Sequence, residues 1–138
     1  MKRTTIYDCG IIILLRNCML QGNLTVVENN KDLPFNIKRV FILYDIEGGK
    51  HRDGHAHKKL WQLIVATCGS FMVTIDDGQQ KRTFMLNRAN QGLLIPPGIW
   101  CKLNDFSSGS ICLILTSELF DESDDIRNYT DFIKYKTL

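Results

Sequence analysis

Long apolar runs are missing from this 138-residue chain. The N-terminal run from Ile11 to Leu15 has only five residues, and Asp8 and Arg16 bracket it. A membrane-spanning helix needs about 20 apolar residues, and a secretory signal peptide needs an apolar core of about 7–15 residues. The sequence therefore predicts neither, and we expect no membrane partner.

An excess of one charge is also missing. The chain has 17 Lys and Arg against 15 Asp and Glu, which gives a net charge of +2. Proteins that bind nucleic acid usually carry a clear basic excess. We therefore expect no nucleic-acid partner, although a few local arginines suffice to bind a small dianion.

Paired cysteine spacing is absent as well. Five cysteines stand singly, at positions 9, 18, 68, 101 and 112. An odd number without CxxC spacing is typical of reduced thiols rather than of a disulfide framework. Together with the missing signal peptide, this pattern predicts a cytoplasmic protein.

The chain has no low-complexity tract, repeat or linker, so we expect one domain over residues 1–138. Apolar and β-branched patterns predict many short strands, over residues 23–28, 37–44, 60–66, 70–76, 82–86, 92–95 and 111–116. Turn residues separate them at Asp77-Gly78 and Pro96-Pro97-Gly98. The one expected helix lies near the C-terminus, with Ser123 as its N-cap and the two following aspartates in its first turn.

The most informative feature present is the histidine pair His55-Ala56-His57. On an extended segment, residues two apart project from the same face. The apolar run that follows reads as a buried strand, which places the pair at the mouth of a β-structure. Imidazole can transfer protons near neutral pH, and it is also the commonest metal ligand.

Many short strands in one small chain predict an all-β sandwich or barrel. A jelly-roll barrel would place both histidines inward, facing the later Gly-Pro-rich turn, and this arrangement resembles a cupin, so we expect a cupin jelly-roll barrel with a short C-terminal helix. In the cupin metal motifs, a glutamate follows HxH, but Trp61 and Gln62 stand in that region here. A histidine follows the later Pro-x-Gly turn, but Cys101 replaces it. Three uses remain open: a zinc site of His55, His57 and Cys101, a metal-free acid–base pair, or a purely structural pair. The missing ligands favour acid–base use, so we expect no metal.

Longer stretches resemble a known family. They are residues 28–40, 52–62, 76–78, 97–100, 105–108, 121–122, 125–129 and Phe132, with Gly54-His55-Ala56-His57-Lys58-Lys59-Leu60 at their centre. From about Gly22 onward the chain is similar to nucleotide-sugar 3,4-ketoisomerases of the cupin superfamily. The resemblance implies a homodimeric isomerase that moves the ketone of dTDP-4-dehydro-6-deoxyglucose from C4 to C3, a step in 3-amino-3,6-dideoxyhexose biosynthesis. A metal-dependent cupin enzyme and a non-catalytic sugar-nucleotide-binding cupin are the alternatives.

The resemblance implies that His55 and His57 transfer the protons of this reaction. A ketone at C4 acidifies the C3 proton, so that a base can form an enediol that is reprotonated at C4. This chemistry needs no redox cofactor, and we expect none. We also expect the N-terminal segment around Ile11 to Leu15 to cross to the second subunit of a homodimer, where it would cover a sheet edge.

Substrate-binding candidates are Arg52, Arg39, Lys58, Gln62, Trp100 and Arg127. An arginine can hold a phosphate through two parallel hydrogen bonds, and an indole can stack on a base or sugar. Each has a simpler alternative. The basic side chains can be solvated or structural, Arg127 can form a salt bridge with a neighbouring acid such as Asp124, and Trp100 can be a packing residue.

Some positions depart from the family pattern. Asp53-Gly54 alters the approach to the histidines, Cys101 replaces a common histidine, and Phe120 replaces a tyrosine. The resemblance implies that the residue pair just before the entry strand, here Gln21-Gly22, influences the C4 configuration of the product. The small Gly22 resembles the galacto-forming members, whereas Gln21 departs from their basic residue. We therefore predict the galacto product.

Overall fold

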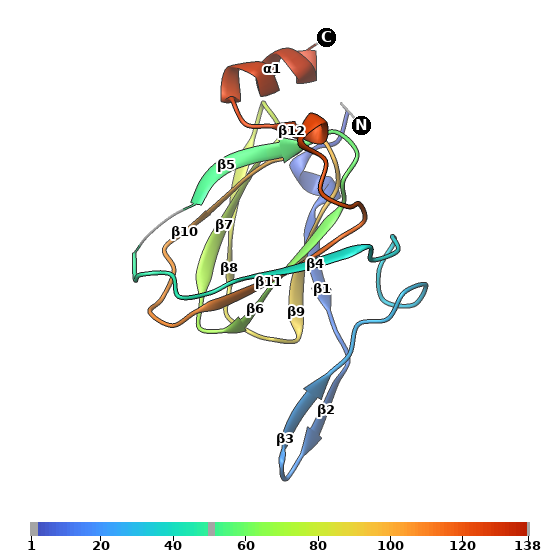
Figure 1. Ribbon diagram of the computed structural model, residues 1–138, viewed down its shortest axis with the longest axis vertical. Coiled ribbons are helices and arrows are strands. Elements are labelled where there is room, and N and C mark those ends of the chain that lie inside the picture. The colour runs from blue at the N-terminus through green and yellow to red at the C-terminus, as the bar shows by residue number, and fades with distance from the viewer. Residues whose placement is uncertain (1–2, 50–51, 138) are drawn as a thin grey trace.

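Two five-stranded antiparallel sheets and a projecting hairpin make up most of the molecule in a computed structural model, which describes residues 3–49 and 52–137 (Figure 1). The first sheet has the order β1-β9-β6-β11-β4 and the second β12-β5-β10-β7-β8. The strands are β1 (Gly10–Ile13), β4 (Arg39–Leu43), β5 (Arg52–His57), β6 (Gln62–Cys68), β7 (Phe71–Asp76), β8 (Lys81–Leu86), β9 (Gln91–Ile95), β10 (Trp100–Asn104), β11 (Ile111–Thr116) and β12 (Asp125–Ile126). This all-β barrel with one short C-terminal helix is the predicted architecture.

The core between the two sheets follows from side-chain alternation. In β7, Phe71, Val73 and Ile75 are buried on one face, as the sequence pattern predicts. In β6, five consecutive residues from Gln62 to Ala66 are buried. One face of β6 contributes to the barrel interior, whereas its other face packs beneath the segment before β4. Gln62 is therefore held inside the barrel at the start of the buried part of β6.

The N-terminal segment leaves the barrel as an exposed hairpin. After the 3₁₀ turn η1 (Ile6–Asp8), strand β1 pairs with β9 of its own chain, and Leu14 is buried. The chain then forms β2 (Arg16–Met19) and β3 (Gly22–Thr25), which extend away from the barrel (Figure 1). Exchange between subunits remains a prediction, and the hairpin is the segment that projects farthest outward.

The predicted start of the C-terminal helix is wrong. Asp121, not Ser123, caps a short 3₁₀ turn, η2 (Glu122–Asp124). Asp125–Ile126 then pairs with β5 as β12, and helix α1 (Tyr129–Thr137) begins beyond the cap supplied by Asn128. The reason is tertiary pairing. Asp125 and Ile126 pair with the edge of β5, and this pairing overrides the local preference of the acidic segment for a helix start. No helix in the described part of the chain is long and apolar enough to span a membrane.

A clasp joins the two ends of the described chain. The Lys136 ammonium on α1 donates hydrogen bonds to the carbonyls of Thr4 (2.7 Å) and Gly98 (2.9 Å). The Thr4 hydroxyl donates to the carbonyl of Pro97 (2.7 Å), in the turn before β10. Gly98 in turn donates its backbone N–H to the His57 carbonyl (2.8 Å). The clasp therefore holds the turn that supports the end of β5.

Candidate active site

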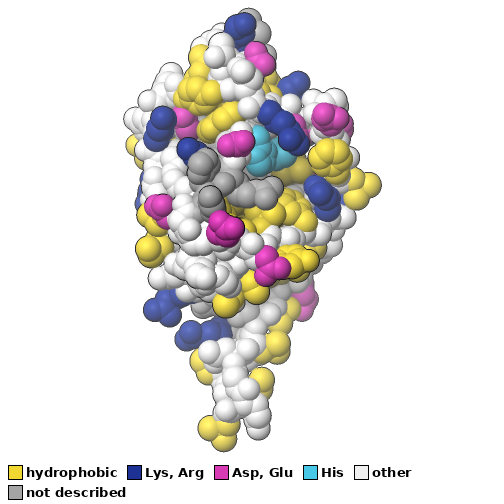
Figure 2. All heavy atoms as spheres, turned by 60° about the vertical axis from the view of Figure 1, so that its left-hand side comes forward, with side chains coloured by type: hydrophobic (Ala, Val, Ile, Leu, Met, Phe, Trp, Pro, Cys, Tyr) yellow, Lys and Arg dark blue, Asp and Glu magenta, His cyan; other side chains and the backbone are white. Residues whose placement is uncertain are grey.

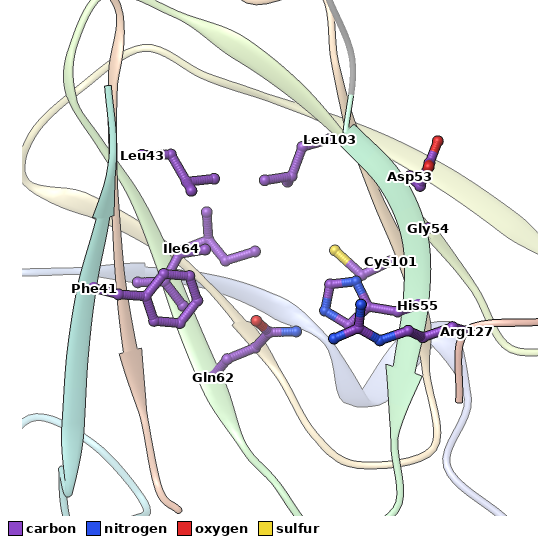
Figure 3. Close-up of a pocket in the computed structure, with 11 residues that line it drawn as sticks. Phe41, Leu43, Asp53, Gly54, His55, Gln62, Ile64, Cys101, Leu103 and Arg127 are labelled. Carbon is purple, nitrogen blue, oxygen red and sulfur yellow. The ribbon is translucent and has the colours of Figure 1, made fainter. Parts of the chain in front are cut away.

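A cavity of about 530 Å³ lies between the two sheets, and its lining side chains point toward one another (Figure 3). Its walls come from strands of both sheets and from the segment after β12. Most of the lining side chains are apolar, and the polar ones gather at one side. The lining residues are Phe41, Leu43, Asp53, Gly54, His55, Gln62, Ile64, Cys101, Leu103, Ile114 and Arg127.

An adjoining pocket of about 260 Å³ continues this cavity toward η2. Phe41, Leu43, His55, Gln62 and Arg127 line both spaces. The pocket adds charged and aromatic residues, among them Arg39, His57, Phe120, Asp124 and Asp125. Figure 2 shows histidine side chains on this face, with basic and acidic side chains close to them.

The histidine pair lies at the junction of the two spaces. The rings of His55 and His57 meet edge to face, with centroids 4.9 Å apart and an angle of 89° between the planes. His55 lines both spaces, whereas His57 lines only the adjoining pocket. Residue alternation along β5 thus brings both imidazoles to one face of the strand. Of the two, only His55 lines the main cavity.

His57 is almost fully enclosed, and two carboxylates approach it. Its Nδ1 lies 3.0 Å from Asp125 Oδ1 and 3.7 Å from Asp124 Oδ2. Burial and the neighbouring His55 lower the pKa of His57 to about 4, although the two aspartates act in the opposite direction. His57 is therefore neutral at pH 7.

Gln62 places an amide in the apolar part of the cavity. The residue is only 5% exposed, and its side chain points across the cavity toward His55 and Arg127 (Figure 3). Within the described residues, this amide makes no hydrogen bond. Buried polar groups normally have a partner, so this amide is available to a ligand oxygen.

Two guanidinium groups stand at the mouth. Arg39 lies over the rings of Phe41 and Phe120, at 4.7 and 5.4 Å from their centroids. Arg127 pairs with Asp125, its Nη2 lying 3.0 Å from Oδ2. The suggested salt bridge between Arg127 and a neighbouring acid thus forms, and the acid is Asp125.

Two of the sequence candidates, Trp100 and Lys58, do not line this cavity or the adjoining pocket. Trp100 packs on the outside of β10 against Tyr129 and Phe132, with ring centroids 5.2 and 5.7 Å away. Its indole also lies against Gly54, where an added Cβ would come within 2.3 Å of Nε1. Lys58 is exposed and lines neither space. The side chain of Arg52 lies outside the described part of the structure.

The sequence analysis missed Asp124 and Asp125 as neighbours of His57, because it assigned them to a helix. The Asp124 carboxylate accepts hydrogen bonds from the backbone N–H groups of Lys59 (2.9 Å) and Leu60 (3.3 Å). It therefore fixes the turn that follows the histidines. One signal in the sequence was available. A polar residue, Asp125, is followed by an apolar one, Ile126, and this alternation is compatible with a short strand that has one buried face.

The donor set for a metal is poor in the described residues, where no group of three or more His, Cys, Asp or Glu side chains is arranged to hold an ion. Cys101 is 3% exposed, and burial raises the pKa of its thiol. A thiol held in its protonated form is a weak ligand. The arrangement thus presents imidazoles, an amide and guanidinium groups to a ligand.

Comparisons with known proteins agree with this site. The family model FdtA: WxcM-like, C-terminal matches residues 7–137. The chain is 42% identical, over 115 residues and 83% of both chains, to the TDP-4-oxo-6-deoxy-alpha-D-glucose-3,4-oxoisomerase of Aneurinibacillus thermoaerophilus.

Solved structures give the same result. The WlaRB TDP-quinovose 3,4-ketoisomerase of Campylobacter jejuni is 36% identical, with a TM-score of 0.88 over 92% of this chain and 98% of that one. QdtA, a sugar 3,4-ketoisomerase of Thermoanaerobacterium thermosaccharolyticum solved with TDP, is 33% identical, with a TM-score of 0.93 over 96% and 97%. A histidine-to-asparagine variant of QdtA was solved with TDP-4-keto-6-deoxyglucose. The chain therefore belongs to the FdtA family, the sugar-nucleotide 3,4-ketoisomerases built on a cupin barrel.

Proposed function

We propose that this protein is an isomerase that converts dTDP-4-dehydro-6-deoxyglucose to the 3-dehydro sugar. The observation that carries the proposal is the His55–His57 pair at the edge of a largely apolar cavity. The named activities of its relatives support the same substrate. Because the five cysteines are free, three of them buried, we place the protein in the cytoplasm.

In the proposed mechanism, His55 removes the C3 proton of the bound sugar. His55 takes this role because it alone of the pair lines the main cavity. Loss of the proton gives an enediolate with its charge on O4. Transfer of the O3 hydroxyl proton to O4 moves the charge to O3, and return of a proton to C4 then leaves the ketone at C3 and a hydroxyl at C4. His57, which is neutral and lines the adjoining pocket, accepts the O3 hydroxyl proton and delivers it to O4, while His55 returns its proton to C4.

Gln62 and the two arginines bind the substrate in this proposal. The amide N–H groups of Gln62 donate to the oxygen that becomes negative in the enediolate, in a cavity whose apolar walls strengthen that interaction. Arg39 and Arg127 face the diphosphate from the mouth. Lys58 and Trp100, which lie away from the cavity, are left out of this assignment.

The deciding experiment is turnover of dTDP-4-dehydro-6-deoxyglucose in D₂O, followed by NMR of the sugar protons. We expect exchange at the carbon positions, with the ketone signal moving from C4 to C3. A protein that binds TDP but leaves the ketone at C4 would be a binding module only.

The absence of a metal requirement is tested in parallel by elemental analysis and by treatment with a chelator. Activity that is lost with chelator and restored by one divalent ion would show a metal enzyme.

Replacement of His55 or His57 by Asn tests the residues directly. Asparagine keeps a polar group of similar shape but cannot carry a proton near pH 7. We expect turnover to fall by about 10²-fold or more for each variant, with TDP affinity retained in calorimetry. Near-normal turnover in the double variant would make the pair structural.

We further propose that the protein is a homodimer in which the β2–β3 hairpin contacts the second subunit. Met19 and Leu20 are 54% and 103% exposed, with no cover from their own barrel.

The hairpin tip also bears on the configuration of the product. Gln21, at this tip, lines neither the main cavity nor the adjoining pocket of its own chain. In this proposal Gln21 influences the C4 configuration because the hairpin tip reaches the cavity of the second subunit. A small H4–H5 coupling in the product would support the galacto configuration, and a large one would overturn it.

A further inference from the structure

The carboxylate of Asp125 is shared between a buried imidazole and an exposed guanidinium. Asp125 lies opposite His57 in the β12–β5 ladder. One oxygen lies 3.0 Å from His57 Nδ1, and the other lies 3.0 Å from Arg127 Nη2. The Asp125 side chain is 9% exposed, whereas that of Arg127 is 69% exposed. A chain of contacts thus runs from the mouth through Asp125 to His57.

The contact between the Asp125 carboxylate and His57 Nδ1 is short, but its geometry is not that of a hydrogen bond. Nδ1 of His57 is buried, and no group in the described residues meets it with hydrogen-bond geometry, although Asp125 Oδ1 is at 3.0 Å. Hydrogen bonds of this kind are often misaligned in a ligand-free protein and align during the reaction. The hydrogen bond from Arg127 to the other oxygen of Asp125 explains the misalignment, because it fixes the orientation of the carboxylate.

The other groups around His57 are already engaged. The two Asp124 oxygens accept backbone N–H groups, as described above, and the nearer lies 3.7 Å from Nδ1. His55 meets the ring edge to face, and the thiol of Cys101 on β10 is protonated. On α1, Tyr135 interacts with Asp124. Asp125 is therefore the acceptor closest to Nδ1.

We propose that Asp125 is a positioning residue that holds the proton of neutral His57 on Nδ1 and leaves Nε2 as the basic nitrogen. Arg127 restrains Asp125, so that release of Arg127 lets the carboxylate align with Nδ1–H. The assignment deepens the proposed function, since a fixed tautomer decides which nitrogen of His57 exchanges protons with the substrate. It needs no change in the barrel, only a rotation of one carboxylate.

The test is NMR of the ligand-free protein with ¹⁵N-labelled histidine at pH 7, with His57 assigned from the His57→Asn spectrum. Wild type should show His57 protonated on Nδ1. Asp125→Asn should lose this preference, because an amide can present either its oxygen or its NH₂ group. Arg127→Gln should shift the Nδ1 proton downfield as the hydrogen bond aligns. Asp131→Asn, an exposed acid on α1, is the matched control and should change nothing.

A His57 protonated on Nε2 in wild type would overturn the proposal even if Asp125→Asn did not fold. An unchanged tautomer in a folded Asp125→Asn protein, or an unmoved Nδ1 proton in Arg127→Gln, would also overturn it. These spectra do not depend on turnover. If wild type does not isomerise the sugar, the proposed function fails while the positioning role is still decided.

Kinetics then test whether Asp125 acts through His57. We expect Asp125→Asn to lower kcat by about 10²-fold, with KM changed by less than about threefold. In a His57→Asn background, the same change should have no further effect, because the group that Asp125 positions is gone. Independent, multiplying losses in the double variant would contradict the assignment.

Discussion

At the residue scale, the two histidines illustrate how two identical side chains acquire different properties. They are separated by one alanine, yet only His55 reaches the main cavity. His57 faces Asp124 and Asp125, and its burial keeps it neutral. The spacing of the two histidines in the sequence predicts that their side chains project from the same face of the strand. Only the pairing of β12 with β5 makes their environments different.

The low pKa of His57 predicts a loss of stability in acid. The folded pKa is about 4 and the ordinary value is 6.5. Between these values the unfolded chain binds more protons than the folded one, so the free energy of unfolding decreases as pH falls from about 6.5 to about 4. The loss is at most about 3 kcal/mol, at 1.36 kcal/mol per pKa unit. Urea unfolding at pH 7 and pH 4.5 should show a smaller loss for His57→Asn than for wild type, and equal losses would refute the shift.

Gln62 gives a second prediction at this scale. Gln62→Leu keeps the size of the side chain and removes its hydrogen bonds to the enediolate. We expect kcat to fall by about 10²–10³-fold, with TDP affinity unchanged in calorimetry. Gln91→Leu, on a strand outside the cavity, is the matched control. Full activity in Gln62→Leu would remove Gln62 from the site.

At the element scale, β5 depends on a close approach between a glycine and an indole. A Cβ at Gly54 would lie 2.3–2.8 Å from three atoms of Trp100, whose ring is also packed against Tyr129 and Phe132. The glycine therefore lets α1 and β10 press against the strand that carries the histidines. The same contacts favour the packing role of Trp100 over stacking on substrate, the two alternatives that the sequence leaves open.

Gly54→Ala should consequently destabilise the protein by about 1–3 kcal/mol, the usual cost of overpacking. Thermal unfolding measures this as a lower Tm. Gly10→Ala on β1 is the control, because nothing lies within 4 Å of its Cβ position. The interpretation fails if both variants melt together.

The sequence predicted the elements with strong local patterns. The alternation of β7 and the apolar run of β11 depend on residues within each strand, and their positions agree closely with the structure. Strand β10 was not predicted, because the Pro-Pro-Gly turn dominates its start. Strand β12 was not predicted either, because Asp125-Ile126 is a strand only beside β5.

The site follows the same division. The histidine pair, Gln62, Arg39 and Arg127 carry local or family signals, and the structure brings all five to the cavity or its adjoining pocket. The role of Asp125 depends on a contact between segments about 70 positions apart, which a single sequence does not reveal. The outward packing of Trp100 likewise requires α1 to be in place.

At the scale of the whole molecule, the exposed hairpin predicts self-association. Exposed apolar side chains that gather on a projecting element mark an interaction surface. Light scattering should show a dimer at micromolar concentration. Leu20→Asn should weaken the dimer without lowering the Tm of the monomer, since Leu20 is fully exposed. Met85→Asn, 58% exposed on β8, should leave association unchanged, and a monomeric wild type would end the proposal.

The clasp of Lys136 on Thr4 and Gly98 has a consequence for engineering. Because the two ends of the described chain meet beside the turn that supports His57, a circularly permuted protein needs only a short peptide to join them. New termini placed between β2 and β3 would free the hairpin strands from each other while leaving both barrel sheets continuous. Such a permutant separates the contribution of the hairpin from that of the barrel, which no point substitution can do.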